Sequence, residues 1–144
     1  MNLVVDASVV IKWALPDSEA EENKEEALAV LATILRGKAS VLQPPHWLAE
    51  VAAVLSRLQP DLAEESIGLL DLMEFPITLD IAVLKRASQM ARMLDHHLFD
   101  TLYHAVALEY GATLVTADAR YSRKAKKLGK LIPLKNWGRT VPEE

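Results

Sequence analysis

The sequence predicts a three-layer α/β/α fold, in which helices cover both faces of a central parallel sheet of four or five strands. Short runs of valine, leucine and isoleucine alternate with longer segments whose apolar residues recur at helical spacing. Strands separated by helices need right-handed crossovers, which place the helices on the two faces of a parallel sheet. The 144 residues suit one domain, and we expect its core over residues 1–136 and a C-terminal tail over residues 137–144.

Five elements are expected in the N-terminal half. In order they are a strand at residues 2–6, a helix at 7–15, a helix at 18–37, a strand at 39–43 and a helix at 47–58. Both strands are apolar runs of strand length, and the helices carry apolar stripes at the spacing of helical turns. Prolines follow the first helix, the second strand and the third helix, where they stop the regular structure. Ser18 and Glu21 fit a capping box for the second helix, and Gly37 fits its end.

The C-terminal half continues the alternation. In order we expect a helix at residues 61–73, a strand at 76–79, helices at 80–93 and 99–110, a strand at 112–116, a basic helix at 119–128 and a strand at 131–134. Asp80 suits the N-cap of the second of these helices, and Gly111 and Gly129 suit the ends of the last two. No internal repeat interrupts the pattern, which agrees with one parallel sheet.

Charge and composition exclude several classes of protein. The net charge is −4, yet the segment 119–142 contains half of the 16 basic residues and no acid, so it is either a surface for nucleic acid or a solvated helix face. The absence of cysteine excludes disulfides, thiolate zinc sites and cysteine nucleophiles. Asp6 and Lys12 interrupt the first apolar stretch too early for a signal peptide or a membrane span. We therefore expect a cytoplasmic protein with no membrane partner.

Two carboxylates are expected at the carboxyl edge of the sheet. Asp6 ends the first strand, and Asp118 follows the strand at residues 112–116 by two residues. Open α/β sheets bind their ligands at this edge, where the strand order reverses. Each acid also suits an N-cap of the helix that follows it. Position alone therefore leaves both a structural and a functional role open.

Two further carboxylates lie in helices. Glu50 follows Trp47 by three residues and precedes Val54 by four, which places it on the apolar stripe of its helix. An unpaired carboxylate is costly there, so we expect Glu50 to meet a cation or to line a cavity. Asp100 opens the helix at residues 99–110, where it suits either a cap or a site.

Together these carboxylates indicate a divalent metal centre. Two close carboxylates repel each other by about 1–4 kcal/mol, so folding alone gives little reason to gather four of them. Mg²⁺ or Mn²⁺ removes the repulsion, because both ions take oxygen ligands and use phosphate oxygens of a substrate. The expected activity is metal-assisted hydrolysis of a phosphodiester. The expected catalytic and metal-binding residues are Asp6, Glu50, Asp100 and Asp118.

The segments that carry these acids resemble a known family. VVDASV at the N-terminus, Glu50 in a helix after the second strand, and FDTLYHAVALEYGATLVTAD are similar to PIN-domain proteins, and within them to the small VapC-type toxins of toxin–antitoxin pairs. The resemblance implies a PIN-like, Rossmann-like fold and a Mg²⁺- or Mn²⁺-dependent endoribonuclease. It also implies Ser8 and Thr116 as hydroxyl groups that support the acids, a VapB-type antitoxin as partner, and a homodimer.

The basic segment supplies the expected contacts with the RNA substrate. These candidates are Arg120, Arg123, Lys124, Lys127 and Trp137. Lysine and arginine neutralise phosphates, and a tryptophan stacks on unpaired bases. Trp47, in contrast, lies on an apolar stripe and is expected in the core. An alternative function is a module of the same fold that binds RNA or protein without cutting it.

Two other metal or hydrolase chemistries are disfavoured. Asp100 and His104 are one helical turn apart and can face one ion, and His96 and His97 lie nearby, which suggests a zinc site. Acids outnumber histidines, however, and no HExxH pattern occurs, so we expect His104 to be packed by its neighbours. A serine hydrolase is disfavoured because no G-x-S-x-G motif is present.

Overall fold

The computed structural model describes residues 1–16 and 22–139, and this part of the chain contains one sheet of four parallel strands. The strands are β1 (Asn2–Val5), β2 (Ser40–Val41), β3 (Thr113–Thr116) and β4 (Leu131–Pro133). Their order across the sheet is β2-β1-β3-β4. The chain moves outward from β1 to β2 in one direction and from β3 to β4 in the other, so the strand order reverses between β1 and β3.

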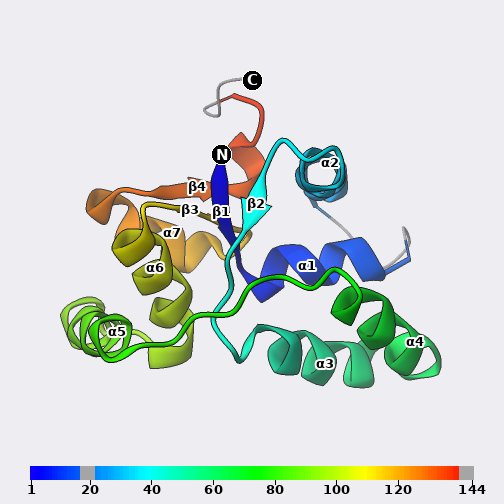
Figure 1. The fold of residues 1–144 in the computed structure, drawn as a ribbon, viewed down its shortest axis with the longest axis horizontal. Coiled ribbons are helices and arrows are strands. Elements are labelled where there is room, and N and C mark those ends of the chain that lie inside the picture. The colour runs from blue at the N-terminus through cyan, green and yellow to red at the C-terminus, as the bar shows by residue number, and fades with distance from the viewer. Residues whose placement is uncertain (17–21, 140–144) are drawn as a thin grey trace.

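Helices flank this sheet on both faces, which confirms the predicted α/β architecture. They are α1 (Ala7–Ala14), α2 (Lys24–Leu35), α3 (Trp47–Leu58), α4 (Pro60–Asp71), α5 (Ile81–Leu94), α6 (Leu98–Tyr110) and α7 (Ala119–Ala125). The 3-10 turns η1 (Lys126–Leu128) and η2 (Leu134–Asn136) follow α7 and β4. In Figure 1, α1 and α2 lie on one side of the strands and α5, α6 and α7 on the other, while α3 and α4 pair beside α1.

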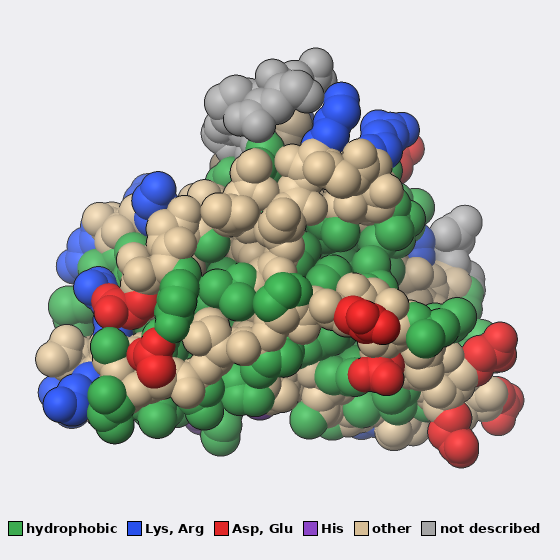
Figure 2. All heavy atoms as spheres, in the orientation of Figure 1, with side chains coloured by type: hydrophobic (Ala, Val, Ile, Leu, Met, Phe, Trp, Pro, Cys, Tyr) green, Lys and Arg blue, Asp and Glu red, His purple; other side chains and the backbone are tan. Residues whose placement is uncertain are grey.

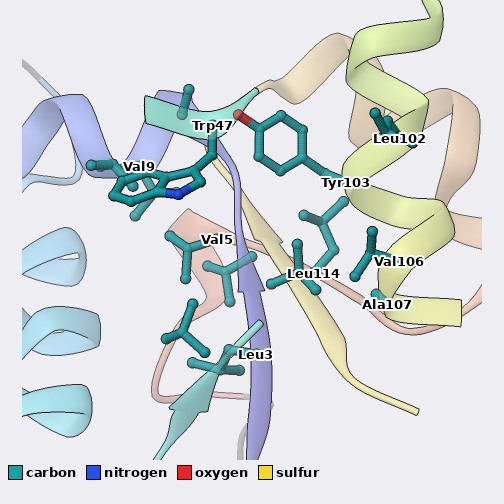
Figure 3. Close-up of a cluster of buried hydrophobic side chains, with 14 of the residues drawn as sticks. Leu3, Val5, Val9, Trp47, Leu102, Tyr103, Val106, Ala107 and Leu114 are labelled. Atoms are coloured by element: carbon teal, nitrogen blue, oxygen red, sulfur yellow. The ribbon is translucent and has the colours of Figure 1, made fainter. Parts of the chain in front are cut away.

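The core lies between the two central strands and the helices that cover them. Leu3, Val5 and Leu114 are buried, and α6 brings a continuous buried run at residues 101–107 against both strands. α6 packs between α5 and the sheet, and a helix covered on two sides needs apolar residues on most of its surface. Trp47 is 4% exposed, so its predicted place in the core is confirmed. Figure 3 shows these side chains on both sides of β1.

A buried glutamine continues the pairing of β1 where β2 has ended. β2 stops at Val41, yet the backbone of Val5 remains paired, because its N–H donates to Gln43 Oε1 at 2.9 Å and its carbonyl accepts from Gln43 Nε2 at 2.8 Å. The Gln43 side chain is completely buried. On the other side, the backbone N–H of Asp6 donates to the carbonyl of Val115 at 3.0 Å. The end of β1, from which Asp6 projects, is therefore fixed from both sides.

The strand predicted at residues 76–79 is wrong. Among the described residues this segment makes a single isolated parallel bridge, between Gln43 and Ile77. Pro44 and Pro45 follow Gln43 and lack N–H donors, so the pairing cannot continue along the chain. The sheet therefore has four strands, the lower of the two numbers predicted.

The start of the second helix and the end of the basic helix differ from the predicted boundaries in what the structure describes. The capping box of Ser18 and Glu21 lies outside the described residues, and the described part of the second helix begins at Lys24. The basic helix predicted to reach Leu128 ends at Ala125 and continues as the 3-10 turn η1. Tightening of the last helical turn into 3-10 geometry is common at helix ends.

Acidic side chains gather at one end of the molecule. Exposed acids on α4 are Asp61, Glu64 and Glu65, and Figure 2 shows acidic side chains at the end of the molecule that carries this helix. The helix α7 lies on the opposite side of the strands from α1 and α2 (Figure 1), and its Arg120 and Arg123 are exposed. Of the helices in the described ranges, none combines the length and the apolar character that crossing a bilayer requires.

Candidate metal centre

The four predicted acids lie at the starts of four helices. Asp6 caps α1 and Asp118 caps α7, so these two stand on either side of the point where the strand order reverses. Glu50 lies in the first turn of α3 and Asp100 in the first turn of α6. The capping role is therefore correct for Asp6 and Asp118, but wrong for Asp100, because His97 occupies the N-cap position of α6. Helix N-termini carry partial positive charge, which favours carboxylates at all four places.

Two hydroxyl groups join the turn after β1 to the turn after β3. Ser8 Oγ donates to Asp6 Oδ2 at 2.5 Å and accepts from Ala117 N at 3.0 Å. Thr116 Oγ1 accepts from Asp118 N at 3.1 Å and lies 3.4 Å from Ser8 Oγ. The two hydroxyls thus set the spacing between the segments that carry Asp6 and Asp118. Ser8 contacts a carboxylate directly, whereas Thr116 acts on the backbone of Asp118.

Asp6, Glu50 and Asp100 are close enough for their charges to interact, and Asp118 acts with Asp6 and Asp100 on Tyr121. Burial raises the pKa of Asp6 to about 7; the negative charges of Asp100 and Glu50 raise it too, while hydrogen bonds from the serine two residues on oppose the shift. Burial also raises the pKa of Tyr121, with further contributions from Asp100, Asp6 and Asp118. Asp6 and Asp100 therefore lie at the centre of a concentrated negative charge.

The structure corrects the surroundings expected for Glu50. Its side chain is 35% exposed rather than buried, and two other side chains contact its carboxylate. Tyr103 donates its hydroxyl hydrogen to Glu50 Oε1 at 2.6 Å, and His46 Nε2 lies 3.4 Å from the same oxygen. Figure 3 shows the Tyr103 hydroxyl pointing from α6 towards the Val5 end of β1. Glu50 is thus held by a hydroxyl at the carboxyl edge of the sheet, with its other oxygen available.

Asp100, Asp118 and His96 form a tight group, in which the two carboxylates are the candidate metal ligands. One ligand atom of each lies within 4.8 Å of the others. His96 Nε2 is 2.8 Å from Asp100 Oδ2, and His96 Nδ1 is 3.3 Å from Lys124 Nζ, which also donates to the carbonyl of Asp95 at 2.7 Å. An ammonium group only donates, so Nδ1 is the acceptor and Nε2 carries the proton that Asp100 accepts. His96 therefore orients one oxygen of Asp100.

Each acid is anchored through one oxygen. The anchored atoms are Asp6 Oδ2, Glu50 Oε1, Asp100 Oδ2 and Asp118 Oδ1. Within the described ranges, no hydrogen bond holds the second oxygen of any of the four. Carboxylate oxygens from four segments, with mutually unfavourable charges and held in place by the protein, are a donor set that fits a hard divalent cation such as Mg²⁺ or Mn²⁺.

The suggestion that Asp100 and His104 face one ion is wrong. His104 is completely buried, with Nε2 2.8 Å from the carbonyl of Gly129 and Nδ1 2.8 Å from the hydroxyl of Tyr121. A carbonyl only accepts, so Nε2 carries the proton and Nδ1 accepts from Tyr121. Neither nitrogen is left for a metal, and burial lowers the pKa of His104. The expectation of a histidine packed by its neighbours is confirmed.

The lowered pKa of His104 predicts a dependence of stability on pH. The unfolded chain takes up this proton near pH 6.5, whereas the folded protein resists it, so the contribution of His104 to stability is complete above pH 6.5 and is lost as the pH falls towards the lower folded pKa. One group contributes a slope of at most about 1.4 kcal/mol per pH unit. Urea unfolding at pH 7.5 and 5.5 should therefore show a smaller loss for His104→Gln than for the wild type.

The control for this measurement is His97→Gln, because His97 is exposed at the start of α6. It should keep the wild-type loss of stability between the two pH values. An equal loss in His104→Gln and the wild type would show that the buried histidine does not set this dependence.

Sequence reasoning missed three aromatic residues that position the acids. Tyr103 bonds Glu50, His46 lies beside it, and Tyr121 bonds both His104 and, through its backbone N–H, Asp118. Spacing offers a signal for two of them, since His46 precedes Glu50 by one helical turn and Tyr121 follows Asp118 by three residues. The contact between Tyr103 and Glu50 joins residues 53 apart and has no local signal.

The predicted RNA contacts divide into two sets. Arg120, Arg123 and Lys127 are exposed on α7 and η1. Lys124 is partly buried and engages His96, and Trp137 is partly buried against the hydrophobic core. The exposed set is available to a polyanion, while Lys124 holds the candidate metal centre together.

The arrangement of these segments can be compared with known families. The profile of the PIN domain family matches residues 3–127, which include all four acids. The chain belongs to the PIN domain family. PIN domains are generally nucleases that use divalent metals, so a metal centre at this edge of the sheet agrees with the family. No curated protein matches this PIN domain.

Proposed function

We propose that this PIN domain is a Mg²⁺- or Mn²⁺-dependent endoribonuclease that hydrolyses phosphodiester bonds of RNA. The observation that carries the proposal is the approach of carboxylate oxygens of Asp100 and Asp118 to within 4.8 Å of each other, with Asp6 close enough to Asp100 and Glu50 for their charges to raise its pKa. Membership of a family that generally consists of nucleases supports it. Folding alone gives little reason to gather these charges, since each close pair of carboxylates costs about 1–4 kcal/mol.

In the proposed mechanism the acids hold the ion through the oxygens that the protein leaves unbonded. The proposed ligands are Asp6, Glu50, Asp100 and Asp118. When bound, a divalent ion polarises the scissile phosphate and makes a neighbouring water more acidic. The chain contributes the geometry: Ser8 holds one oxygen of Asp6, and Thr116 fixes the turn that carries Asp118. Such supporting bonds orient the ligands before the substrate arrives.

Two other side chains complete this support. Tyr103 keeps its proton, because burial raises its pKa well above the usual range, and so it acts as a donor to Glu50. His96 donates to Asp100 and is itself held by Lys124. Neither residue needs to touch the substrate. Their role is to direct the free oxygens of Glu50 and Asp100 towards the centre.

The proposal is tested by incubating the purified protein with labelled structured RNAs in Mg²⁺, in Mn²⁺ and in EDTA. We expect products of internal cleavage with either ion and none in EDTA, because the acids alone repel a phosphate. Retention of RNA without products under all three conditions would contradict the nuclease and favour the alternative of a non-cleaving binding module. The exposed cations of α7 alone would give that second result.

The proposal extends to the biological role. We assign the chain to the VapC-type toxins, as a cytoplasmic homodimer held inactive by a VapB-type antitoxin. This part rests on the resemblance of VVDASV and of the segment from Phe99 to Asp118, not on geometry. Co-expression with the product of a neighbouring small gene should relieve growth arrest by this chain; arrest that persists would remove the antitoxin from the proposal.

A further inference from the structure

A cavity of about 410 Å³ lies beside the candidate metal centre. Its walls come from the turn after β3, from α7 with η1, and from the turn after β4, and the segment before α2 closes one side. Ala117 and Ala119, the two neighbours of Asp118 in the chain, both line it. A group bound in this cavity therefore lies next to the turn that carries Asp118. The nuclease chemistry described above does not use the cavity.

The wall of the cavity contains a buried hydroxyl group without a partner. Ser122 is 7% exposed, and its Oγ makes no hydrogen bond to any described residue. A buried polar group left unpaired costs about 1–3 kcal/mol. Ser122 lines the cavity, but its Oγ is covered by neighbouring atoms, so rotation of the side chain about its Cα–Cβ bond is needed to bring the hydroxyl to a ligand there, which can then accept the hydrogen bond that the protein does not provide.

The charge of the walls selects an anion. Arg123, Lys126 and Lys135 line the cavity, against one carboxylate, that of Glu22. In the described ranges none of the three cations forms an ion pair. A hydroxyl donor surrounded by arginine and lysine is suited to phosphate oxygens, which accept several charge-assisted hydrogen bonds at once. A metal cation would be repelled, and a neutral ligand would leave the charges uncompensated.

We propose that this cavity binds a phosphate group of the RNA substrate next to the one that is cleaved. The inference rests on the proposed function for the identity of the ligand, and on Ser122, Arg123 and Lys126 for the site itself. The RNA would then be bound at two neighbouring places. The acids would bind the ion that contacts the scissile phosphate, and the cavity would hold the adjacent phosphate and so fix the position of the RNA strand. Of these three residues, only Arg123 was expected from the sequence to contact RNA.

The test measures binding rather than cleavage. Fluorescence anisotropy with a short labelled RNA in EDTA, where nothing is cut, compares the wild type with Ser122→Ala and Lys126→Gln. We expect Ser122→Ala to weaken binding about tenfold, the effect of one hydrogen bond to a charged group. Lys126→Gln should weaken binding and make the slope of log affinity against log salt less negative by about 0.7. The control is Lys85→Gln, an exposed lysine on α5, which should bind within twofold of the wild type.

Competition by inorganic phosphate tests whether the cavity binds a phosphate group of RNA or a free anion. For an RNA subsite, phosphate should compete with RNA on the wild type and should compete much less on Ser122→Ala. If phosphate binds but RNA affinity is unchanged in both variants, the cavity is a site for free anions and the inference is overturned. Equal RNA affinity in all variants, with no effect of phosphate, also overturns it.

The RNA-binding measurement can fail or succeed separately from the cleavage measurement that tests the nuclease. Weakened binding by Ser122→Ala in a protein that never cleaves RNA would support the cavity and contradict the nuclease. Metal-dependent cleavage with unchanged RNA affinity in both variants would support the nuclease and contradict the proposed phosphate site in the cavity. Circular dichroism and thermal melting verify the fold of Ser122→Ala, and Lys126→Gln changes an exposed side chain, so at least one variant reports on binding alone.

Discussion

Asp100→Asn and Asp6→Asn should each reduce metal-dependent cleavage of RNA by about 100-fold or more, because removing even a residue that only supports a ligand commonly costs 10–100-fold. Both changes keep the shape of the side chain and the oxygen that accepts the bond from His96 or Ser8. They remove the negative charge that an ion requires. Initial rates in saturating Mg²⁺ and Mn²⁺, with the wild type alongside, measure the effect.

The control for the two variants is Asp71→Asn, which changes an exposed carboxylate at the end of α4. Its cleavage rate should equal that of the wild type. We also expect both site variants to melt at or above the wild-type temperature in EDTA, because each removes one charge from a crowded group. Wild-type cleavage by Asp100→Asn would remove this residue from the proposed ligands.

Gln43→Leu should destabilise the fold by about 2–6 kcal/mol, since it leaves both the N–H and the carbonyl of Val5 buried without partners, at about 1–3 kcal/mol each. Leucine has a similar volume to glutamine, so the loss is one of hydrogen bonds rather than of packing. The two bonds, of 2.9 and 2.8 Å, are the continuation of the pairing of β1 beyond the end of β2. Urea unfolding at neutral pH, with the slope checked for constancy, measures the change.

Gln89→Leu on α5 is the matched control, because Gln89 is exposed and its replacement changes the same groups in water. Its free energy of unfolding should stay within about 0.5 kcal/mol of the wild-type value. A Gln43→Leu protein of wild-type stability would mean that Val5 finds other partners, and the glutamine would then not be needed to hold the end of β1.

The fold could be predicted where the local pattern and the tertiary role agree. β1, β3 and β4 are apolar runs closed by an acid, a glycine or a proline, and the structure has all three within a residue or two of the predicted bounds. The segment at residues 76–79 has the same local pattern, but Gln43, the residue to which it bridges, lies beyond the end of β2 and is followed by two prolines. Whether a run pairs depends on what the neighbouring chain can offer, and that is a property of two distant segments.

The site shows the same division. Asp6 and Asp118 could be placed at one edge because each follows a strand, and parallel strands bring their carboxyl ends together. The bond from Tyr103 to Glu50 could not be predicted, because it joins residues that are 53 apart in the sequence. His104 was raised as a candidate ligand from helical spacing alone, whereas its ring points towards Gly129 and Tyr121 on the next segments.

The anchoring of each acid through one oxygen has a consequence for the proposed binding of an ion. Since hydroxyl, imidazole and backbone groups already fix the four side chains, binding of a cation by their second oxygens would require little movement of the chain. In the proposed metal centre, occupancy would therefore follow the concentration of free ion, and removal of the ion would leave the fold intact.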